Sequence, residues 1–188
     1  MLSYEAFSII PTGIPTIIPA SPHDSMLSSL VRRLGSMAST NISAADDHWH
    51  GAIDVVIAAP VEKVWEIASD WLKFPRCCSV ECSEGENGVP GCVRKVKAYN
   101  SNFWVAEKLT RIDHSCRIIS YDLVGGNTGI DVGYRASFQA VAEGENKTRV
   151  VWPFMFSPEQ VCVESWTAIV KKKVKAHIKE LEELAQKD

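Results

Sequence analysis

Alternating apolar and polar residues through the middle of the chain predict a β-rich domain. From Trp49 to Ile57, apolar residues recur at every second position, which is the period of a strand with one buried face. Six further strand-like runs follow, at about 78–84, 91–99, 103–112, 117–124, 131–142 and 148–156. Turn-rich segments at 84–88 and 143–146 separate some of them. The pattern therefore predicts seven strands.

Helical periods appear after the first strand-like run and after the last. Pro60 opens a segment with amphipathic helical spacing, and a second short helix is expected around 71–74, before Pro75. At about 159–185, apolar residues recur at steps of three and four, while lysines occupy the other face. Glutamates lie close behind these lysines, so we interpret them as a solvated helix face instead of a membrane or nucleic-acid patch.

The order of elements is thus strand, two short helices, six strands and a long helix. A curved antiparallel sheet wrapped around the C-terminal helix satisfies this order, because the two apolar surfaces then bury each other. The predicted fold class is α+β. Folds of this kind commonly bind small ligands between the sheet and the helix.

Residues 1–47 differ from the remainder, which we take as one domain, 48–188. Four prolines interrupt an apolar, serine-containing stretch that follows neither period, so we expect a disordered extension. A secretory signal fits poorly, because no positively charged segment precedes the apolar part. An organellar transit peptide, which would imply a plastid location, and an upstream extension of no consequence are the alternatives. We prefer the upstream extension of no consequence.

Composition limits the classes of partner. The 188 residues carry 20 basic and 23 acidic side chains, which argues against nucleic-acid binding. No apolar run approaches the roughly 20 residues that span a membrane. Six cysteines, of which Cys77 and Cys78 are adjacent and the other four scattered, form no C-x-x-C motif and indicate reduced, mostly buried thiols and a cytoplasmic protein. We expect a monomer or weak dimer that uses no metal and no cofactor.

Two charged residues fall on the apolar face of the strands at 91–99 and 103–112. Arg94 shares the parity of small and apolar neighbours, and Glu107 shares that of Phe103 and Val105. If the strands form a hairpin with a turn at 100–101, Arg94 lies directly opposite Glu107, with Cβ atoms about 5 Å apart. The pair then either fills the sheet interior as an ion pair, or acts as a polar centre in which the arginine holds an oxyanion and the carboxylate moves a proton.

Aromatic residues of the following strands share the inward face. Tyr121, Tyr134, Trp152 and Phe154 all have inward parity, and their plain interpretation is core packing. A buried tyrosine hydroxyl needs a partner, so contact with a ligand is the alternative for both tyrosines. The expected ligand contacts are therefore Phe103, Val105, Tyr121, Tyr134, Trp152 and Phe154.

Several motifs together resemble the helix-grip superfamily of the birch pollen allergen and START-like proteins, and within it the plant lachrymatory-factor synthases. They are Gly91-Cys92-Val93-Arg94, Phe103-Trp104 with Glu107-Lys108-Leu109, Ile119-Ser120-Tyr121, and the region of Trp152, in a likeness that spans about 49–185. The resemblance implies a cofactor-free isomerase that converts an alkenyl sulfenic acid into a thial S-oxide. Its catalytic arginine and glutamate match Arg94 and Glu107, and family tyrosines match Tyr121 and, if a loop has changed length, Tyr134.

The chain is also similar to the abscisic acid receptors at 119–126, but it lacks their gate and latch motifs. A hormone receptor is therefore disfavoured. Two hypotheses remain: an isomerase acting on a sulfenic acid or similar small substrate, and a non-catalytic carrier of a hydrophobic plant metabolite.

Overall fold

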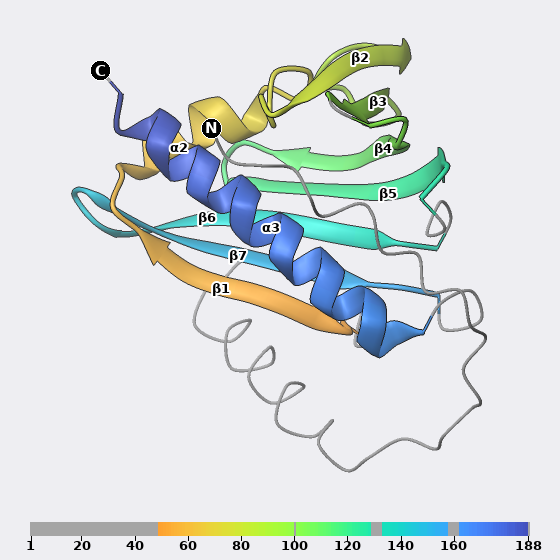
Figure 1. The fold of residues 1–188 in the computed structure, drawn as a ribbon. Helices are drawn as coiled ribbons and strands as arrows, with labels where there is room; N and C mark the ends of the chain where they lie inside the picture. The colour runs from red at the N-terminus through yellow and green to blue at the C-terminus, as the bar shows by residue number, and fades with distance from the viewer. Residues whose placement is uncertain (1–48, 100, 129–132, 158–161, 188) are drawn as a thin grey trace. The chain divides into compact units, whose positions relative to one another are not determined.

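The computed structural model describes residues 49–187, apart from 100, 129–132 and 158–161. The expected disorder of residues 1–47 lies outside this range, as does the beginning of the helix expected at about 159–185. Within it, the chain forms a seven-stranded antiparallel sheet in the order β1-β7-β6-β5-β4-β3-β2 (Figure 1). The strands are β1 (Gly51–Ile57), β2 (Cys78–Glu84), β3 (Val93–Ala98), β4 (Trp104–Asp113), β5 (Ile118–Gly126), β6 (Arg135–Gly144) and β7 (Lys147–Met155).

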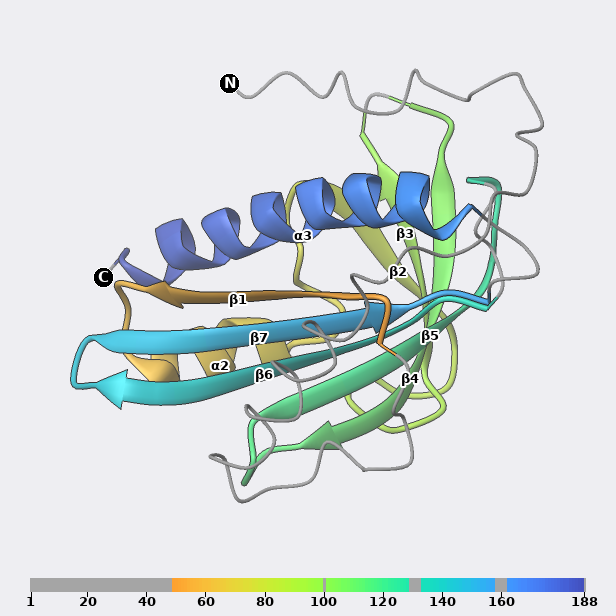
Figure 2. The same cartoon turned by 90° about the horizontal axis from the view of Figure 1, so that it is seen from below.

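Two helices accompany the sheet in the described part of the chain. Helix α2 (Val61–Ser69) follows β1, and α3 (Val163–Ala185) lies across one face of the curved sheet (Figures 1 and 2). The second short helix expected after β1 is reduced to a single turn, in which the N–H groups of Lys73 and Phe74 both bind Asp70 O. This α+β architecture is the predicted helix-grip fold. Neither described helix has an apolar stretch long enough to cross a membrane.

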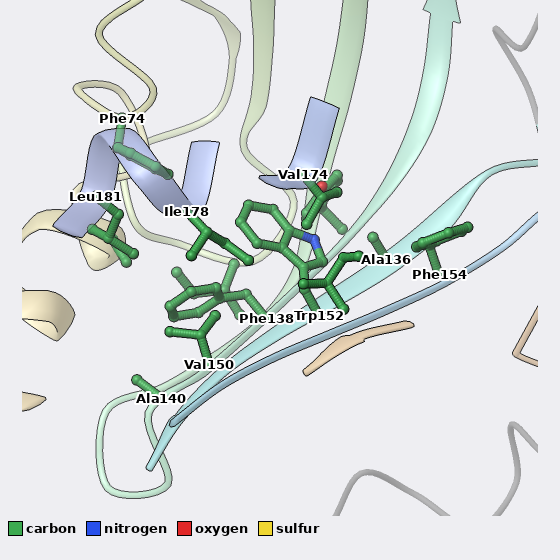
Figure 3. Close-up of a cluster of buried hydrophobic side chains, with 14 of the residues drawn as sticks. Phe74, Ala136, Phe138, Ala140, Val150, Trp152, Phe154, Val174, Ile178 and Leu181 are labelled. Carbon is green, nitrogen blue, oxygen red and sulfur yellow. The ribbon is translucent and has the colours of Figure 1, made fainter. Parts of the chain in front are cut away.

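The core lies between the sheet and α3 (Figure 3). The inward residues of β5, β6 and β7 alternate as their parity predicts, and on α3 one stripe is buried, at Val170, Val174, Ile178, Leu181 and Ala185. On the outer face, cross-strand ion pairs replace apolar contacts: Arg149 binds Asp54 through two nitrogens, and Arg135 binds Asp122. The two faces thus differ in the way the alternating sequence indicates.

Gly51 and Phe154 form a close contact within the core. They are directly opposite each other on β1 and β7. A Cβ added to Gly51 would lie 2.6 Å from Cζ of Phe154, so the ring fits only because residue 51 has no side chain. Phe154 is fully buried there.

The expectation of mostly buried cysteines is wrong. All six are free thiols, but only Cys78 and Cys92 are buried, while Cys82 and Cys162 are exposed. Cys82 lies on β2, which is an edge strand of the sheet, and Cys162 immediately precedes α3. Both places leave a side chain open to solvent.

Candidate ligand-binding and catalytic site

Arg94 and Glu107 lie opposite each other on β3 and β4, in the register that strand parity predicts. Arg94 Nε donates to Glu107 Oε2 at 2.7 Å, and Nη2 lies 2.6 Å from the same oxygen. The two side chains are only 8% and 13% exposed. The strands therefore hold a close, largely desolvated ion pair, whose net contribution to stability is small because desolvation offsets the attraction.

The rest of the Arg94 guanidinium is bound by the turn that follows α2. Nη1 donates to Trp71 O at 2.5 Å and to Phe74 O at 2.6 Å. The Trp71 ring covers the guanidinium, with 3.5 Å between its centre and Cζ of Arg94. A guanidinium has five N–H groups, so these contacts leave one N–H, on Nη2, without a partner among the described residues. Arg94 can offer a ligand at most one hydrogen bond.

The carboxylate of Glu107 is less occupied. Both Arg94 contacts converge on Oε2, and Oε1 accepts no hydrogen bond from the described part of the chain. A carboxylate oxygen held in place but free of donors can accept a proton from a bound molecule. Of the two partners, Glu107 is thus the better placed to carry a proton, and Arg94 to position it.

Two tyrosines continue the inward face beyond this pair. The Tyr121 ring centre lies 5.6 Å from that of Trp71 and 6.3 Å from that of Tyr134. Burial raises the pKa of Tyr121, and the negative charge of Glu107 adds to the effect, although Arg94 opposes it. Burial raises the pKa of Tyr134 well above its usual value, and the neighbouring Tyr121 adds to that. Both phenols therefore remain protonated donors at any physiological pH.

Several buried polar atoms in the described residues have no hydrogen-bond partner. They are Trp71 Nε1, Trp152 Nε1, Thr167 Oγ1, His177 Nε2 and Glu180 Oε2. The indole N–H of Trp152 is close enough to Tyr121 to lower the pKa of that phenol, but the two groups do not reach hydrogen-bond geometry. Each such atom costs about 1–3 kcal/mol of folding free energy. A protein that binds a polar molecule in its interior recovers that cost on binding.

His177 was not among the residues that the sequence singled out. It lies on α3 between buried Val174 and Ile178, with its ring centre 6.3 Å from that of Trp152 and 6.2 Å from that of Phe74. The sequence did contain a signal, because His177 falls at the helical spacing of the apolar stripe, three residues after Val174 and next to Ile178, where a polar side chain is unexpected. The lysines around it made the histidine resemble a residue of the polar face.

The other expected ligand contacts differ in how deeply they are buried. Trp152 is buried on the inward face, and Val105 is half-buried and packs against the core. Phe103, just before β4, is half-buried at the end of the sheet. Phe154 is fully buried against Gly51 and the ring of Phe156, as a core residue would be. The structure thus brings Arg94, Glu107, Tyr121, Tyr134 and Trp152 to the face covered by α3.

The family model described as polyketide cyclase / dehydrase and lipid transport matches residues 48–186, well over half of the chain. The chain belongs to this family. Membership in the polyketide cyclase / dehydrase and lipid transport family supports binding of a hydrophobic small molecule by this chain. The inward aromatic residues provide the apolar surface that such a ligand requires.

Solved structures with the same fold come from distant relatives. A protein from Thermobifida fusca is 23% identical, with a TM-score of 0.59, over 70% of this chain and 89% of its own. XoxI from Bacillus cereus is 18% identical, with a TM-score of 0.61, over 72% of this chain and 94% of its own. Ara h 8.0201 is 22% identical, with a TM-score of 0.58, over 72% and 95%. At such identities the likeness shows the fold alone, a helix-grip sheet around a C-terminal helix.

Proposed function

We propose that this member of the polyketide cyclase / dehydrase and lipid transport family is a cofactor-free isomerase of the lachrymatory-factor synthase type. The observation that carries the proposal is the asymmetry of the buried pair: Arg94 is almost saturated, whereas Glu107 Oε1 has no donor in the described chain. Such a carboxylate is suited to moving a proton within a bound small molecule. The resemblance of the motifs around Arg94, Glu107 and Tyr121 to those synthases names the substrate class.

The proposed reaction needs no other group. The carboxylate of Glu107 takes the proton from the S–O–H of an alkenyl sulfenic acid, and the electron pair shifts through sulfur toward the alkene. Glu107 then returns that proton to the far alkene carbon, which gives the thial S-oxide. Atoms and charge balance, because the same proton leaves oxygen and arrives at carbon. The remaining N–H of Arg94 would stabilise the oxygen as its charge develops.

The decisive experiment offers freshly generated alkenyl sulfenic acid to the purified protein and measures the formation of the thial S-oxide. Glu107→Gln keeps the size of the side chain and a hydrogen-bond acceptor for Arg94, but it cannot take the proton. We expect at least a 100-fold loss of kcat, in keeping with general acid–base catalysis. Product formation that is the same for wild type and Glu107→Gln would overturn the proposal.

A carrier of a hydrophobic metabolite is the second candidate, favoured by the apolar interior and its unpartnered polar atoms. It predicts a retained small molecule, visible by native mass spectrometry of the purified protein. It also predicts no turnover with any of the variants. A ligand-free protein with turnover lost in Glu107→Gln would reject the carrier and support the isomerase.

A further inference from the structure

Trp152 and His177 approach each other from opposite layers of the fold. Trp152 belongs to β7 and His177 to α3, and their ring centres are 6.3 Å apart. Each contributes a buried nitrogen without a hydrogen-bond partner in the described residues. Figure 3 shows the Trp152 indole between the sheet and α3, close to Val174 and Ile178. A polar atom of a bound molecule would satisfy these two nitrogens, which come from facing layers of the fold.

The side chains around these two nitrogens determine what that atom can be. The Trp152 ring also packs edge-on against Phe138, and the His177 ring against Phe74. An indole N–H can only donate, so the partner must accept a hydrogen bond. Imidazole Nε2 can donate in one tautomer, and it can then share the same acceptor.

The acceptor is best explained as uncharged. Arg94 on the inward face is already bound to Glu107 and to two backbone carbonyls. Burial lowers the pKa of Lys173, which lies one turn before His177 on α3, so this interior disfavours the charged form of that lysine as well. A carboxylate near Trp152 would lie among aromatic rings in the same surroundings, which is unfavourable. The raised pKa values of Tyr121 and Tyr134 indicate the same preference for neutral groups in this interior.

We propose that Trp152 and His177 form a second polar binding site, which takes an uncharged, hydrogen-bond-accepting oxygen of a mainly apolar ligand. A carbonyl oxygen or an S-oxide oxygen has the required chemistry. The proposal rests on the proposed function only in requiring that a small molecule enters the interior. It assigns recognition to a site separate from the proton-transferring carboxylate, so the two can be tested independently.

The test compares two probes of the same shape, acetophenone and α-methylstyrene, which differ in having C=O or C=CH₂. Dissociation constants come from NMR titrations that follow the indole N–H signals, with the Trp152 signal assigned by its loss in Trp152→Phe. We expect wild type to prefer acetophenone by about fivefold or more, as one to two net hydrogen bonds would give. We also expect the Trp152 signal to move downfield with acetophenone only.

His177→Leu and His177→Gln are the matched variants. Leucine fills the space without a polar atom and should reduce the preference to what the Trp152 N–H alone provides, whereas glutamine offers an amide N–H and should retain more of it. Equal binding of the two probes, an unchanged preference in His177→Leu, or binding of neither probe would overturn the proposal. Glu107→Gln separates the two ideas: it should abolish isomerisation but leave the preference for acetophenone intact. If Glu107→Gln keeps both the preference for acetophenone and the turnover, only the isomerase proposal is rejected.

Discussion

Arg94 and Trp71 are joined by two contacts at once. The indole ring lies 3.5 Å from the guanidinium carbon, and the carbonyl oxygen of the same tryptophan accepts a hydrogen bond from Nη1 at 2.5 Å. Because Arg94 also binds Glu107 and Phe74 O, one side chain ties β3 to β4 and to the turn after α2. Its planar fork of donors, which lysine lacks, makes this possible.

We expect Arg94→Met to be strongly destabilising. It leaves a buried carboxylate and two carbonyl groups without their donor, which should lower the free energy of unfolding by roughly 3–5 kcal/mol. Adding Glu107→Leu should restore much of the loss, because the uncompensated charge is then gone. Urea denaturation of the single and double variants measures both effects.

Arg135→Met is the control for this cycle. Arg135 pairs with Asp122 on the outer face of the sheet, where its side chain is 44% exposed, so its loss should cost at most about 1 kcal/mol. If Arg94→Met and Arg135→Met lower the free energy of unfolding equally, the Arg94–Glu107 pair is as well solvated as the Arg135–Asp122 pair.

Gly51→Ala should destabilise the domain by about 1–3 kcal/mol, since the new methyl group meets the Phe154 ring at 2.6 Å. The matched substitution is Gly125→Ala, on β5, where the added Cβ would lie 3.7 Å from Cβ of Ala106, an ordinary contact. Thermal unfolding of the two variants should therefore differ, with Gly51→Ala melting lower. If both melt together, the ring of Phe154 has moved aside.

Alkaline titration should reveal the two buried tyrosines. Burial raises the pKa values of Tyr121 and Tyr134, so both should stay protonated above pH 10, the ordinary pKa of a tyrosine phenol. Tyrosinate absorbance measures the ionisation above that pH, and Tyr121→Phe should diminish it.

The raised pKa values of Tyr121 and Tyr134 also predict how the stability of the fold depends on pH. Above about pH 10 the unfolded chain loses its phenol protons while the folded chain keeps them, so the folded state binds more protons. The free energy of unfolding must then decrease as pH rises above that value. A flat stability profile in this range would mean that the two hydroxyls reach solvent.

His177→Leu should raise the stability of the ligand-free protein by about 1 kcal/mol. The substitution removes a buried nitrogen that has no partner in the described residues and leaves an apolar side chain between Trp152 and Phe74. Chemical denaturation without ligand provides the measurement. A loss of stability would instead indicate that the imidazole has a structural role, such as a bound water at Nε2.

The local sequence pattern was sufficient to predict the strands and the pairing of Arg94 with Glu107. The side chains of a strand alternate between two faces, so parity alone placed Arg94 and Glu107 inward, and the short hairpin between their strands set them opposite each other. The same argument located Tyr121, Tyr134 and Trp152 on the buried face. The second short helix expected at 71–74, before Pro75, is a single turn in the structure.

Tertiary structure decided what each of these groups is free to do. The carbonyls that bind Nη1 of Arg94 come from residues 20 and 23 positions earlier, and no periodicity tells where a turn will direct its oxygens. His177 becomes notable only because α3 places it over Trp152 with no partner for its buried nitrogen. Alternation assigns a side chain to a face, whereas hydrogen bonding depends on the positions of atoms from several elements, which are settled only when those elements pack together.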